Sequence, residues 1–493
     1  MNFVESENHF SCCRFKGYEK ISCTFKGRNI FSKQAVYQLF FLKKPVLMNT
    51  NLQSEGDINI TPARKKWTEN NIDPESKKLL DEDASCFLHQ TLSTPCLNVI
   101  ESCAGSTITL ATGQTLLDFH GNYIHNLGFG HPEIVAAITE MLPKLSFSTR
   151  RYTNRPAIEL AKKLTSFSPS LTRVLFAPGG AEAVSMAIKV ARAVTGRHKT
   201  ISLWDSFHGA TLDAISVGGE AVFRKDIGPL MPGTHHVPPP NPSECPFHCG
   251  DTCNMSCANY IEYILDKEGD VSAVIAETIR CAPFIPPKEY WQTVRAACDR
   301  HGALLILDEI PHALGRTGKM FTFQHYGIEP DMVVIGKGLG GGIMPFAALI
   351  VKEEFNEKTR NQSLGHFTHE KNPIACVAAL KMIEIIERDN LLEHVEHMHH
   401  YSIEQMTRMK ESQPYIYDVR ALGLIMGIEL RHPDTKEKAS ALAESVMYRS
   451  LELGLSFKCS MGNILNLTPP VNVSKDELQQ AFSIIKQALA ELV

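Results

Sequence analysis

The sequence has no long hydrophobic run and no large excess of charge. No apolar stretch approaches the length needed to span a bilayer, which argues against a membrane protein. The 50 lysines and arginines nearly balance the 54 aspartates and glutamates, so composition gives no case for nucleic acid or a membrane surface as partner. No signal peptide opens the chain, and 14 cysteines are scattered through it. We therefore expect reduced thiols and a cytoplasmic location.

The first 47 residues lack the periodicity of a helix or a strand. They mix Phe, Lys and Cys, and Met48 then begins a polar stretch that is typical of an ordinary start. Arginine is sparse here and glutamates are present, which disfavours a mitochondrial presequence. We expect residues 1–47 to be a disordered leader or a non-native extension.

From about Arg173 onward, short β-branched runs alternate with amphipathic helical segments. Predicted buried strands are 174–177, 200–204, 273–276, 303–307, 332–335 and 347–351, and predicted helices include 181–195 and 288–301. This alternation indicates an α/β fold with a mostly parallel central sheet sandwiched by helices. A ligand site is expected beyond the carboxyl ends of its strands.

The remaining segments predict a second, smaller domain. Residues 377–493 contain long helices around 377–388 and 439–453, with short strands at 424–430 and 464–467, which indicates an α+β arrangement. We expect residues 126–376 to form the large domain. Residues 48–125 would be an N-terminal segment that joins the small one.

Two charged residues stand at the ends of predicted strands. Asp308 closes one apolar run, and Lys337 closes another and is followed by the glycine-rich stretch 338–342. An ammonium at the mouth of a buried sheet is costly unless it is neutral or covalently bound, and glycines let a bulky ligand approach the backbone. The pair indicates pyridoxal phosphate (PLP), with Lys337 bonded to it and Asp308 beside its ring nitrogen. Taken singly, each residue also fits a solvated lysine or a helix-capping aspartate.

Three further motifs could contact such a cofactor. Gly180 and Ala181 begin a helix after a predicted strand, where free backbone amides and the helix dipole favour a phosphate. Phe207 and His208 follow the next strand, and the aromatic ring could stack on a flat cofactor or simply fill the core. Thr368 lies in a polar loop after the lysine strand and could offer its hydroxyl to a phosphate.

The order and spacing of these motifs resemble those of the class III (ω-amino acid) aminotransferases, PLP enzymes of fold type I. The resemblance covers roughly residues 117–493. Matching segments are 130–132, 180–183, 207–209, 308–309, 315–318, Lys337, Thr368 with 372–373, and 419–424. It implies that Lys337 is the Schiff-base lysine and that Phe207 stacks on the pyridine. It also implies that Thr368 reaches the phosphate of a neighbouring subunit's cofactor, which requires a homodimer or larger homo-oligomer with shared active sites.

Departures from the family pattern bear on the reaction. Pro311 stands where the family has a glutamine that contacts the ring hydroxyl of the cofactor, and proline has no donor to replace it. Ala181 removes a hydroxyl from the phosphate turn. Arg280 replaces another glutamine near the cofactor, where it could bind a phosphonate or phosphate or form an ion pair with Glu277.

Other candidates for the substrate side come from the resemblance. Tyr123, Arg150 and Arg151 stand in segments that line the substrate side in the family, although surface solvation would explain the arginines equally well. Arg420 matches an arginine that often holds a substrate carboxylate. The substrate is therefore expected to be a small anionic amine.

Three kinds of enzyme in the family fit the sequence. The chain most resembles the lyase branch that converts (R)-1-hydroxy-2-aminoethylphosphonate to phosphonoacetaldehyde and ammonia in phosphonate catabolism. An ω-aminotransferase that uses pyruvate or 2-oxoglutarate is the first alternative, and an enzyme like ethanolamine-phosphate phospho-lyase is another. A zinc-holding interaction protein without catalysis is the alternative from a different class.

That last alternative depends on four cysteines in the stretch 235–257, which we expect to be a loop insertion. Cys245, Cys249, Cys253 and Cys257 recur at every fourth position. This spacing is allowed for zinc, but one short run would have to surround the ion alone. We therefore assign no metal and expect buried or half-buried thiols.

Overall fold

A seven-stranded sheet lies at the centre of the larger group of elements. The computed structural model describes residues 60–90, 94–249 and 253–493, so the predicted extension 1–47 lies outside the described residues. The strand order is β4-β10-β9-β8-β7-β5-β6. Their bounds are β4 (Leu171–Ala177), β5 (Lys199–Leu203), β6 (Thr234–Val237), β7 (Val271–Glu277), β8 (Leu304–Asp308), β9 (Met332–Ile335) and β10 (Ala347–Lys352).

Six of these strands run in one direction. Only β10 is antiparallel, to both β4 and β9, so the predicted mostly parallel sheet is confirmed. β6 occupies part of the stretch 235–257 that the sequence predicts as loop. Its four residues are only half-buried except for Val237, which leaves little apolar pattern to recognise.

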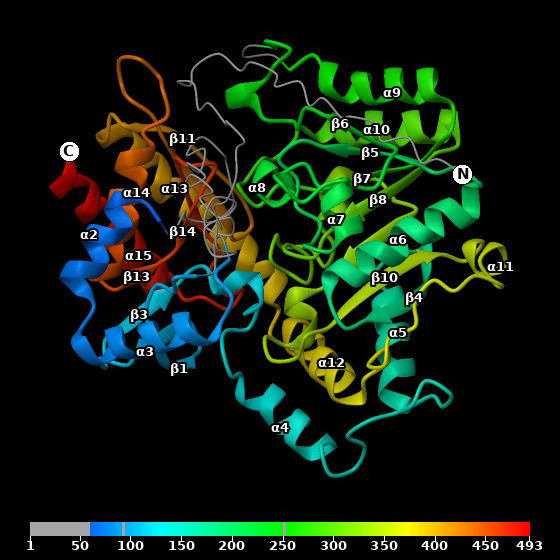
Figure 1. Cartoon of the computed structure of the whole chain (residues 1–493), viewed down its shortest axis with the longest axis horizontal. Coiled ribbons are helices and arrows are strands. Elements are labelled where there is room, and N and C mark those ends of the chain that lie inside the picture. The colour runs from blue at the N-terminus through cyan, green and yellow to red at the C-terminus, as the bar shows by residue number, and fades with distance from the viewer. Residues whose placement is uncertain (1–59, 91–93, 250–252) are drawn as a thin grey trace, which may run out of the picture. The chain divides into compact units, whose positions relative to one another are not determined.

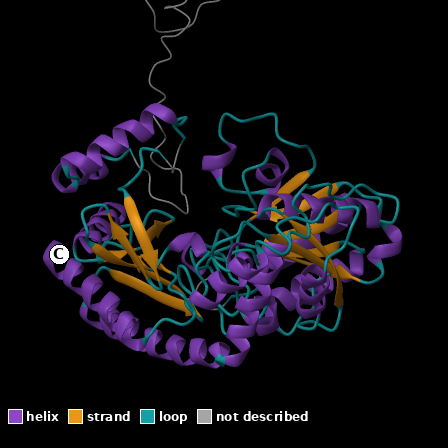
Figure 2. Ribbon diagram, turned by 90° about the horizontal axis from the view of Figure 1, so that it is seen from below, coloured by secondary structure: helices purple, strands orange, loops and turns teal. Residues whose placement is uncertain are grey.

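Both faces of the sheet are buried, because successive side chains of a strand pack into two different apolar clusters. Ile275 of β7 packs in one apolar cluster with α6 (Gly180–Thr195), whereas Val274 and Ala276 pack in another that includes Trp291 of α10 (Lys288–His301). Successive side chains point to opposite faces, so a strand covered on both sides is apolar throughout. Helices flank the strands of this sheet in Figure 2.

Two four-stranded sheets complete the β structure of the described chain. The first has the order β1 (Ile100–Ala104), β2 (Thr107–Leu110), β3 (Thr115–Asp118) and β13 (Leu455–Ser456). The second has the order β11 (Ile416–Leu422), β12 (Ile425–Leu430), β15 (Ile464–Leu467) and β14 (Lys458–Ser460). Because β13 pairs with β3, N-terminal and C-terminal segments share one sheet. The predicted boundaries 48–125, 126–376 and 377–493 stay predictions.

The remaining helices lie around these sheets (Figure 1). They are α2 (Pro62–Asn71), α3 (Pro74–Cys86), α4 (Pro132–Met141), α5 (Arg155–Thr165), α7 (Leu212–Val217), α8 (Ala221–Arg224), α9 (Ser256–Glu268), α11 (Phe355–Lys358), α12 (Pro373–Arg388), α13 (Leu391–Ser412), α14 (Ser440–Glu452) and α15 (Lys475–Leu492). Within the described ranges, none of the helices combines the length and the apolarity that crossing a bilayer would require.

Candidate active site

A cavity of about 200 Å³ opens where β7, β8 and β9 end. Its walls come from five separate segments, in line with the rule that ligands bind beyond the carboxyl ends of parallel strands. The lining residues are Gly180, Ala181, Phe207, His208, Gly209, Glu277, Asp308, Ile310, Pro311 and Lys337. Six of the seven residues predicted to contact a cofactor are among them; Thr368 is not.

Asp308 presents a buried carboxylate to this cavity. The residue is only 1 % exposed because it ends β8, a strand covered on both sides. One carboxylate oxygen accepts a hydrogen bond of 2.8 Å from Nδ1 of His208, and the other accepts one of 3.1 Å from the backbone amide of Ile310. These bonds hold the carboxylate in one orientation. His208 therefore orients the carboxylate of Asp308. The sequence does not predict this contact, because the two residues are 100 positions apart.

The start of α6 supplies backbone donors at the same cavity. Gly179 is the N-cap, and the first amides of a helix have no partner within it. A Cβ on Gly180 would lie 2.7 Å from Ile310. A Cβ on Gly209, whose φ is +122°, would lie 2.6 Å from that of Ala181. Glycine is thus required at Gly209, where the 207–209 turn meets the backbone of the helix start, whereas at Gly180 the close atom is the flexible end of the Ile310 side chain.

Lys337 follows β9 with a backbone that lysine rarely adopts. Its φ is +46°, in the left-handed region, and the short helical turn Lys337–Gly340 begins there. A Cβ on Gly338 would lie 2.4 Å from Oδ1 of Asn126. At Gly338 it is therefore a side chain of the protein itself that makes the close approach, rather than a ligand as predicted. Arg316 donates to the same Asn126 oxygen at 2.7 Å and so holds it there.

The amine of Lys337 lies over an aromatic ring. Its Nζ is 4.7 Å from the ring centroid of Tyr123, a buried residue that also has a left-handed backbone, with φ +63°. Left-handed conformations cost energy in residues other than glycine and are concentrated at functional sites. Tyr123 was predicted from the resemblance alone, and the structure brings it against Lys337.

Arg280 is held by two carboxylates. Its Nη1 donates to both oxygens of Glu277, at 3.1 and 2.9 Å, and its Nη2 donates to Glu220 at 3.1 Å. All three side chains are buried. The predicted alternative of an ion pair with Glu277 is therefore present. Glu220 was not predicted, because it lies 60 residues away and no motif marks it.

None of the predicted arginines, Arg280 included, lines the cavity. Arg420 donates Nε to the carbonyl of Pro283 at 2.7 Å and Nη1 to Asp418 and Glu429 at 2.7 and 2.8 Å. Arg150 and Arg151 are exposed in the segment before α5. Thr368 is also exposed, in the loop before α12.

The predicted cysteine loop is partly described. The Sγ atoms of Cys245 and Cys249 lie 3.5 Å apart, and Cys249 contacts the side chain of Asn254. Burial raises the pKa of the Cys257 thiol to about 11, so this thiol stays protonated. No group of three or more metal-ligating side chains is found in the described ranges 60–90, 94–249 and 253–493.

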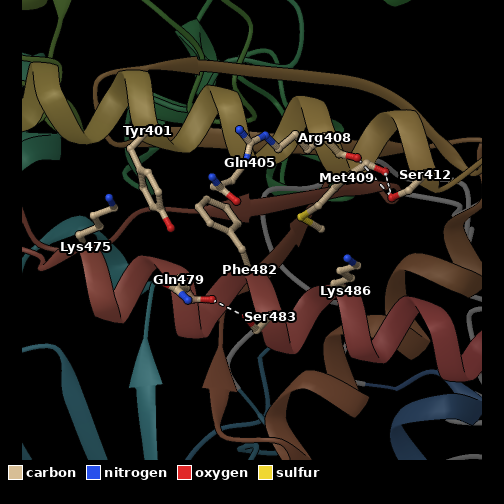
Figure 3. Close-up of a pocket in the computed structure, with 10 residues that line it drawn as sticks. All are labelled: Tyr401, Gln405, Arg408, Met409, Ser412, Lys475, Gln479, Phe482, Ser483 and Lys486. Carbon is tan, nitrogen blue, oxygen red and sulfur yellow. Dashed lines mark hydrogen bonds between the residues drawn. The ribbon is translucent and has the colours of Figure 1, made fainter.

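A second cavity, of about 500 Å³, lies between α13 and α15 (Figure 3). Its walls are Tyr401, Gln405, Arg408, Met409, Ser412, Lys475, Gln479, Phe482, Ser483 and Lys486. Each side chain comes from the facing surface of one of the two helices, and Phe482 fills the middle of the gap. Despite its size, this cavity holds none of the predicted site residues.

The first cavity fits PLP. It offers an amine for the cofactor's aldehyde at Lys337 and a buried carboxylate for the ring nitrogen at Asp308. The helix start at Gly180 presents amides suited to a phosphate, and the ring of Phe207 presents a flat face. Pro311 also lines the cavity, so a position that holds a glutamine donor in the family offers none here.

Comparison with known families agrees with this geometry. The family model of the class-III aminotransferases matches residues 89–489, most of the chain. The chain therefore belongs to the class-III aminotransferase family and is a PLP-dependent enzyme with the fold of type I. The predictions of family, fold class and cofactor are confirmed.

Three similar proteins show the range of the family. The chain is 46% identical over 468 residues to the (R)-1-hydroxy-2-aminoethylphosphonate ammonia-lyase of Vibrio splendidus, which covers 91% of this chain and 98% of that protein. It is 35% identical to a leucine/methionine racemase of Thermococcus litoralis, over 75% of this chain and 85% of that one. The solved PLP-bound amine transaminase of an uncultivated Pseudomonas species is 28% identical, with a TM-score of 0.77 over 80% of this chain and 95% of that one.

Proposed function

We propose that this enzyme is an ammonia-lyase that converts (R)-1-hydroxy-2-aminoethylphosphonate to phosphonoacetaldehyde and ammonia, in phosphonate catabolism. The observation that carries the proposal is the cavity that joins Lys337 and Asp308, in a chain 46% identical to an enzyme with this name along almost its whole length. A racemase and a transaminase share the same fold, so the fold alone does not select the reaction.

In this mechanism Lys337 has two tasks and Asp308 has one. PLP, when bound, withdraws electrons from the carbon that bears the substrate amine. Lys337 would hold the cofactor through Nζ, and the same amine, when free, would remove a proton from that carbon. Asp308 keeps a proton on the ring nitrogen, and the hydrogen bond from His208 Nδ1 fixes the carboxylate for this task.

Elimination is possible because the substrate carries a leaving group on the carbon next to the one that loses its proton. The carbon next to the amine-bearing carbon carries a hydroxyl in this substrate. Loss of the proton to Lys337 and of hydroxide from the neighbouring carbon leaves an unsaturated amine. Water then converts that amine to the aldehyde and ammonia. One water is released and one is consumed, so the substrate becomes phosphonoacetaldehyde and ammonia without another co-reactant.

The test is release of ammonia and aldehyde from (R)-1-hydroxy-2-aminoethylphosphonate with no keto acid present. Sustained turnover at many equivalents per active site is the expected result. A single turnover that resumes only when pyruvate is added would contradict the lyase and indicate an aminotransferase. Ethanolamine phosphate, offered in the same assay, distinguishes a phospho-lyase by release of inorganic phosphate.

One observation favours the aminotransferase as a second candidate. Within the part of the chain that the structure describes, Nη2 of Arg420 is buried and has no hydrogen-bond partner. The carboxylate of a keto-acid acceptor could use this donor, but Arg420 does not line the first cavity, so its side chain would have to rearrange for the two to meet. Saturable stimulation of turnover by 2-oxoglutarate, lost in Arg420→Gln, would support this candidate over the lyase.

The family resemblance also supports a shared active site. Thr368 is exposed in the single chain and matches the threonine that contacts a neighbouring subunit's phosphate, so we expect a homodimer or larger homo-oligomer. A cytoplasmic location is expected separately, from the scattered cysteines of the sequence. Sedimentation of the holoenzyme tests the assembly. Mixed dimers of a Thr368→Ala subunit and a Lys337→Ala subunit test whether the hydroxyl acts across the interface. If it does, the one active site that keeps Lys337 also receives Thr368 from its partner, and activity should return.

A further inference from the structure

The second cavity, between α13 and α15, is larger than the first and has no part in the proposed reaction. Its volume of about 500 Å³ lies in the range of small-molecule sites. Its lining positions recur every three or four residues, from Tyr401 to Ser412 on α13 and from Lys475 to Lys486 on α15, so each wall is one face of a helix. Helix faces that meet usually pack through apolar side chains, but most side chains here are polar. The two faces therefore leave a space lined by polar groups.

Each wall of this cavity is held in place from behind. Val395 and Met406 anchor α13 in the main apolar cluster, and Leu478 and Ile485 anchor α15 in the same cluster. All four side chains are fully buried. The walls thus keep their positions without a ligand between them, and a preformed site needs little reorganisation on binding.

One end of the cavity offers flat rings and amides. The ring of Tyr401 is half-buried, and the ring of Phe482 is buried in the middle of the gap (Figure 3). Gln405 and Gln479 line the cavity from opposite helices. Aromatic side chains stack on nucleobases, and primary amides can both donate to and accept from the edge of a base. This end therefore suits a flat heterocycle.

Charges of both signs surround the ring of Tyr401. Nζ of Lys475 lies 5.0 Å from the ring centroid. Burial raises the pKa of the Tyr401 hydroxyl, and the carboxylates of Asp476 and Glu404 raise it further, so the hydroxyl stays protonated. Because these carboxylates offset the lysine, a neutral ring matches this end better than an anion does.

Positive charge lies toward the other end of the cavity. Lys486 stands at that end of α15 (Figure 3), and Arg408 stands four residues before Ser412 on α13. Nη2 of Arg408 donates to Glu404 at 2.5 Å, and a guanidinium has further donors to give. Within residues 60–90, 94–249 and 253–493, the amine of Lys486 has no ion pair or hydrogen bond, and no acidic residue lines the cavity. This end therefore suits a phosphate.

The two ends are well separated. Lys486 lies eleven residues beyond Lys475 on α15, which is about 16 Å along the helix axis. A two-carbon amine is far shorter and has no ring to place against Tyr401 and Phe482, so this cavity does not suit the proposed substrate. A base joined through a sugar to a chain of phosphates has the flat ring, the length and the terminal charge that the walls match.

We propose that the second cavity binds a nucleoside triphosphate, with its base against Tyr401 and Phe482 and its phosphates at Arg408 and Lys486. The site is separate from the cavity that joins Lys337 and Asp308. The proposal therefore stands or falls independently of the reaction that the enzyme catalyses.

Three variants separate the ring from the charge. Arg408→Gln combined with Lys486→Met removes two cations from the cavity, and both side chains are exposed, so folding should not suffer. Lys162→Met combined with Lys410→Met removes the same charge from exposed lysines that do not line the cavity. Tyr401→Leu removes the half-buried ring and leaves every cation in place.

Binding is measured by titration calorimetry on the holoenzyme with ATP, GTP, adenosine and inorganic triphosphate, in about 0.1 M salt without divalent metal. We expect one saturable site per chain for ATP, GTP or both, with a dissociation constant below about 1 mM. Adenosine and triphosphate should each bind about tenfold more weakly or worse. The variant without Arg408 and Lys486 should weaken nucleotide binding about tenfold, and the variant without Lys162 and Lys410 should stay within about twofold. Tyr401→Leu should weaken nucleotide binding about fivefold and leave triphosphate unchanged.

The contrary results overturn the proposal in distinct ways. If neither nucleotide binds saturably up to about 1 mM, the cavity is not a nucleotide site. Equal affinities for triphosphate and ATP indicate attraction of any polyanion. Undiminished affinity without Arg408 and Lys486 places the nucleotide elsewhere on the protein. Displacement of the nucleotide by 2-aminoethylphosphonate, which lacks the hydroxyl that elimination expels, would place it in the first cavity instead.

Discussion

The two sides of the first cavity satisfy their charges in different ways. On the cofactor side, Asp308 receives bonds from His208 and from a backbone amide, and these orient the carboxylate toward the cavity. On the other side, Glu277 lines the cavity, and behind it Arg280 is enclosed between Glu277 and Glu220. The comparison teaches that a charged residue in the right motif is not thereby a ligand-binding group. Its partners decide whether it faces a ligand or the rest of the protein.

The strongest way to test the cofactor side is Lys337→Ala. Loss of the amine removes both the attachment point and the base, so we expect turnover to fall by about 10³-fold or more. The cofactor's visible absorbance should shift to that of the unattached form. Steady-state rates and the absorbance spectrum measure both effects. Retention of the wild-type spectrum would contradict the assignment of Lys337.

Asp308→Asn is expected to have the next largest effect on activity. The amide has nearly the same shape but no charge to hold a proton on the ring nitrogen, so turnover should fall by about 10²-fold or more. Titration with cofactor should show weaker binding. His208→Gln serves as the matched variant, and its effect should be smaller and in the same direction, since it acts only through the carboxylate. An inactive His208 variant beside a fully active Asp308 variant would reverse the roles of the two residues.

Arg280→Ala tests the opposite side of the comparison. It leaves two buried carboxylates without their cation, which should lower the free energy of unfolding by about 3–5 kcal/mol. Denaturant unfolding measures the loss. Combining Arg280→Gln with Glu220→Gln should recover part of it, because fewer charges remain uncompensated. Unchanged stability with a large rise in the KM for the phosphonate would instead assign Arg280 to the substrate.

A smaller effect is expected from the buried imidazole of His125. Burial lowers its pKa to about 3 from an ordinary 6.5, so the folded protein keeps it neutral while the unfolded chain binds a proton below pH 6.5. Stability from this group is present above pH 6.5 and is lost as the pH falls, by about 2 kcal/mol between pH 7 and pH 5. Unfolding curves for wild type and His125→Gln at both pH values measure it. The variant should lose about that much less on acidification, and parallel losses would mean that another group carries the effect.

The central sheet could be predicted closely. Its strands are continuous apolar runs because both faces are covered, and the predicted run 332–335 coincides with β9. β6 was missed because it is a half-buried strand at the edge of the sheet, and its residues carry no such run. Helix α13 was not predicted from the sequence either.

By itself, the sequence determined the cofactor side of the site: strands that end in Asp308 and Lys337, and a glycine turn that begins α6. Each of these features is local, and local pattern decides where strands end and helices start. Only the tertiary structure decided the partners: His208 for Asp308, Glu220 for Arg280, and Lys458 beside the ring of Tyr123. These contacts join segments from 60 to more than 300 residues apart. Packing rather than chain spacing determines which charges meet, and so which of them remain available to a ligand.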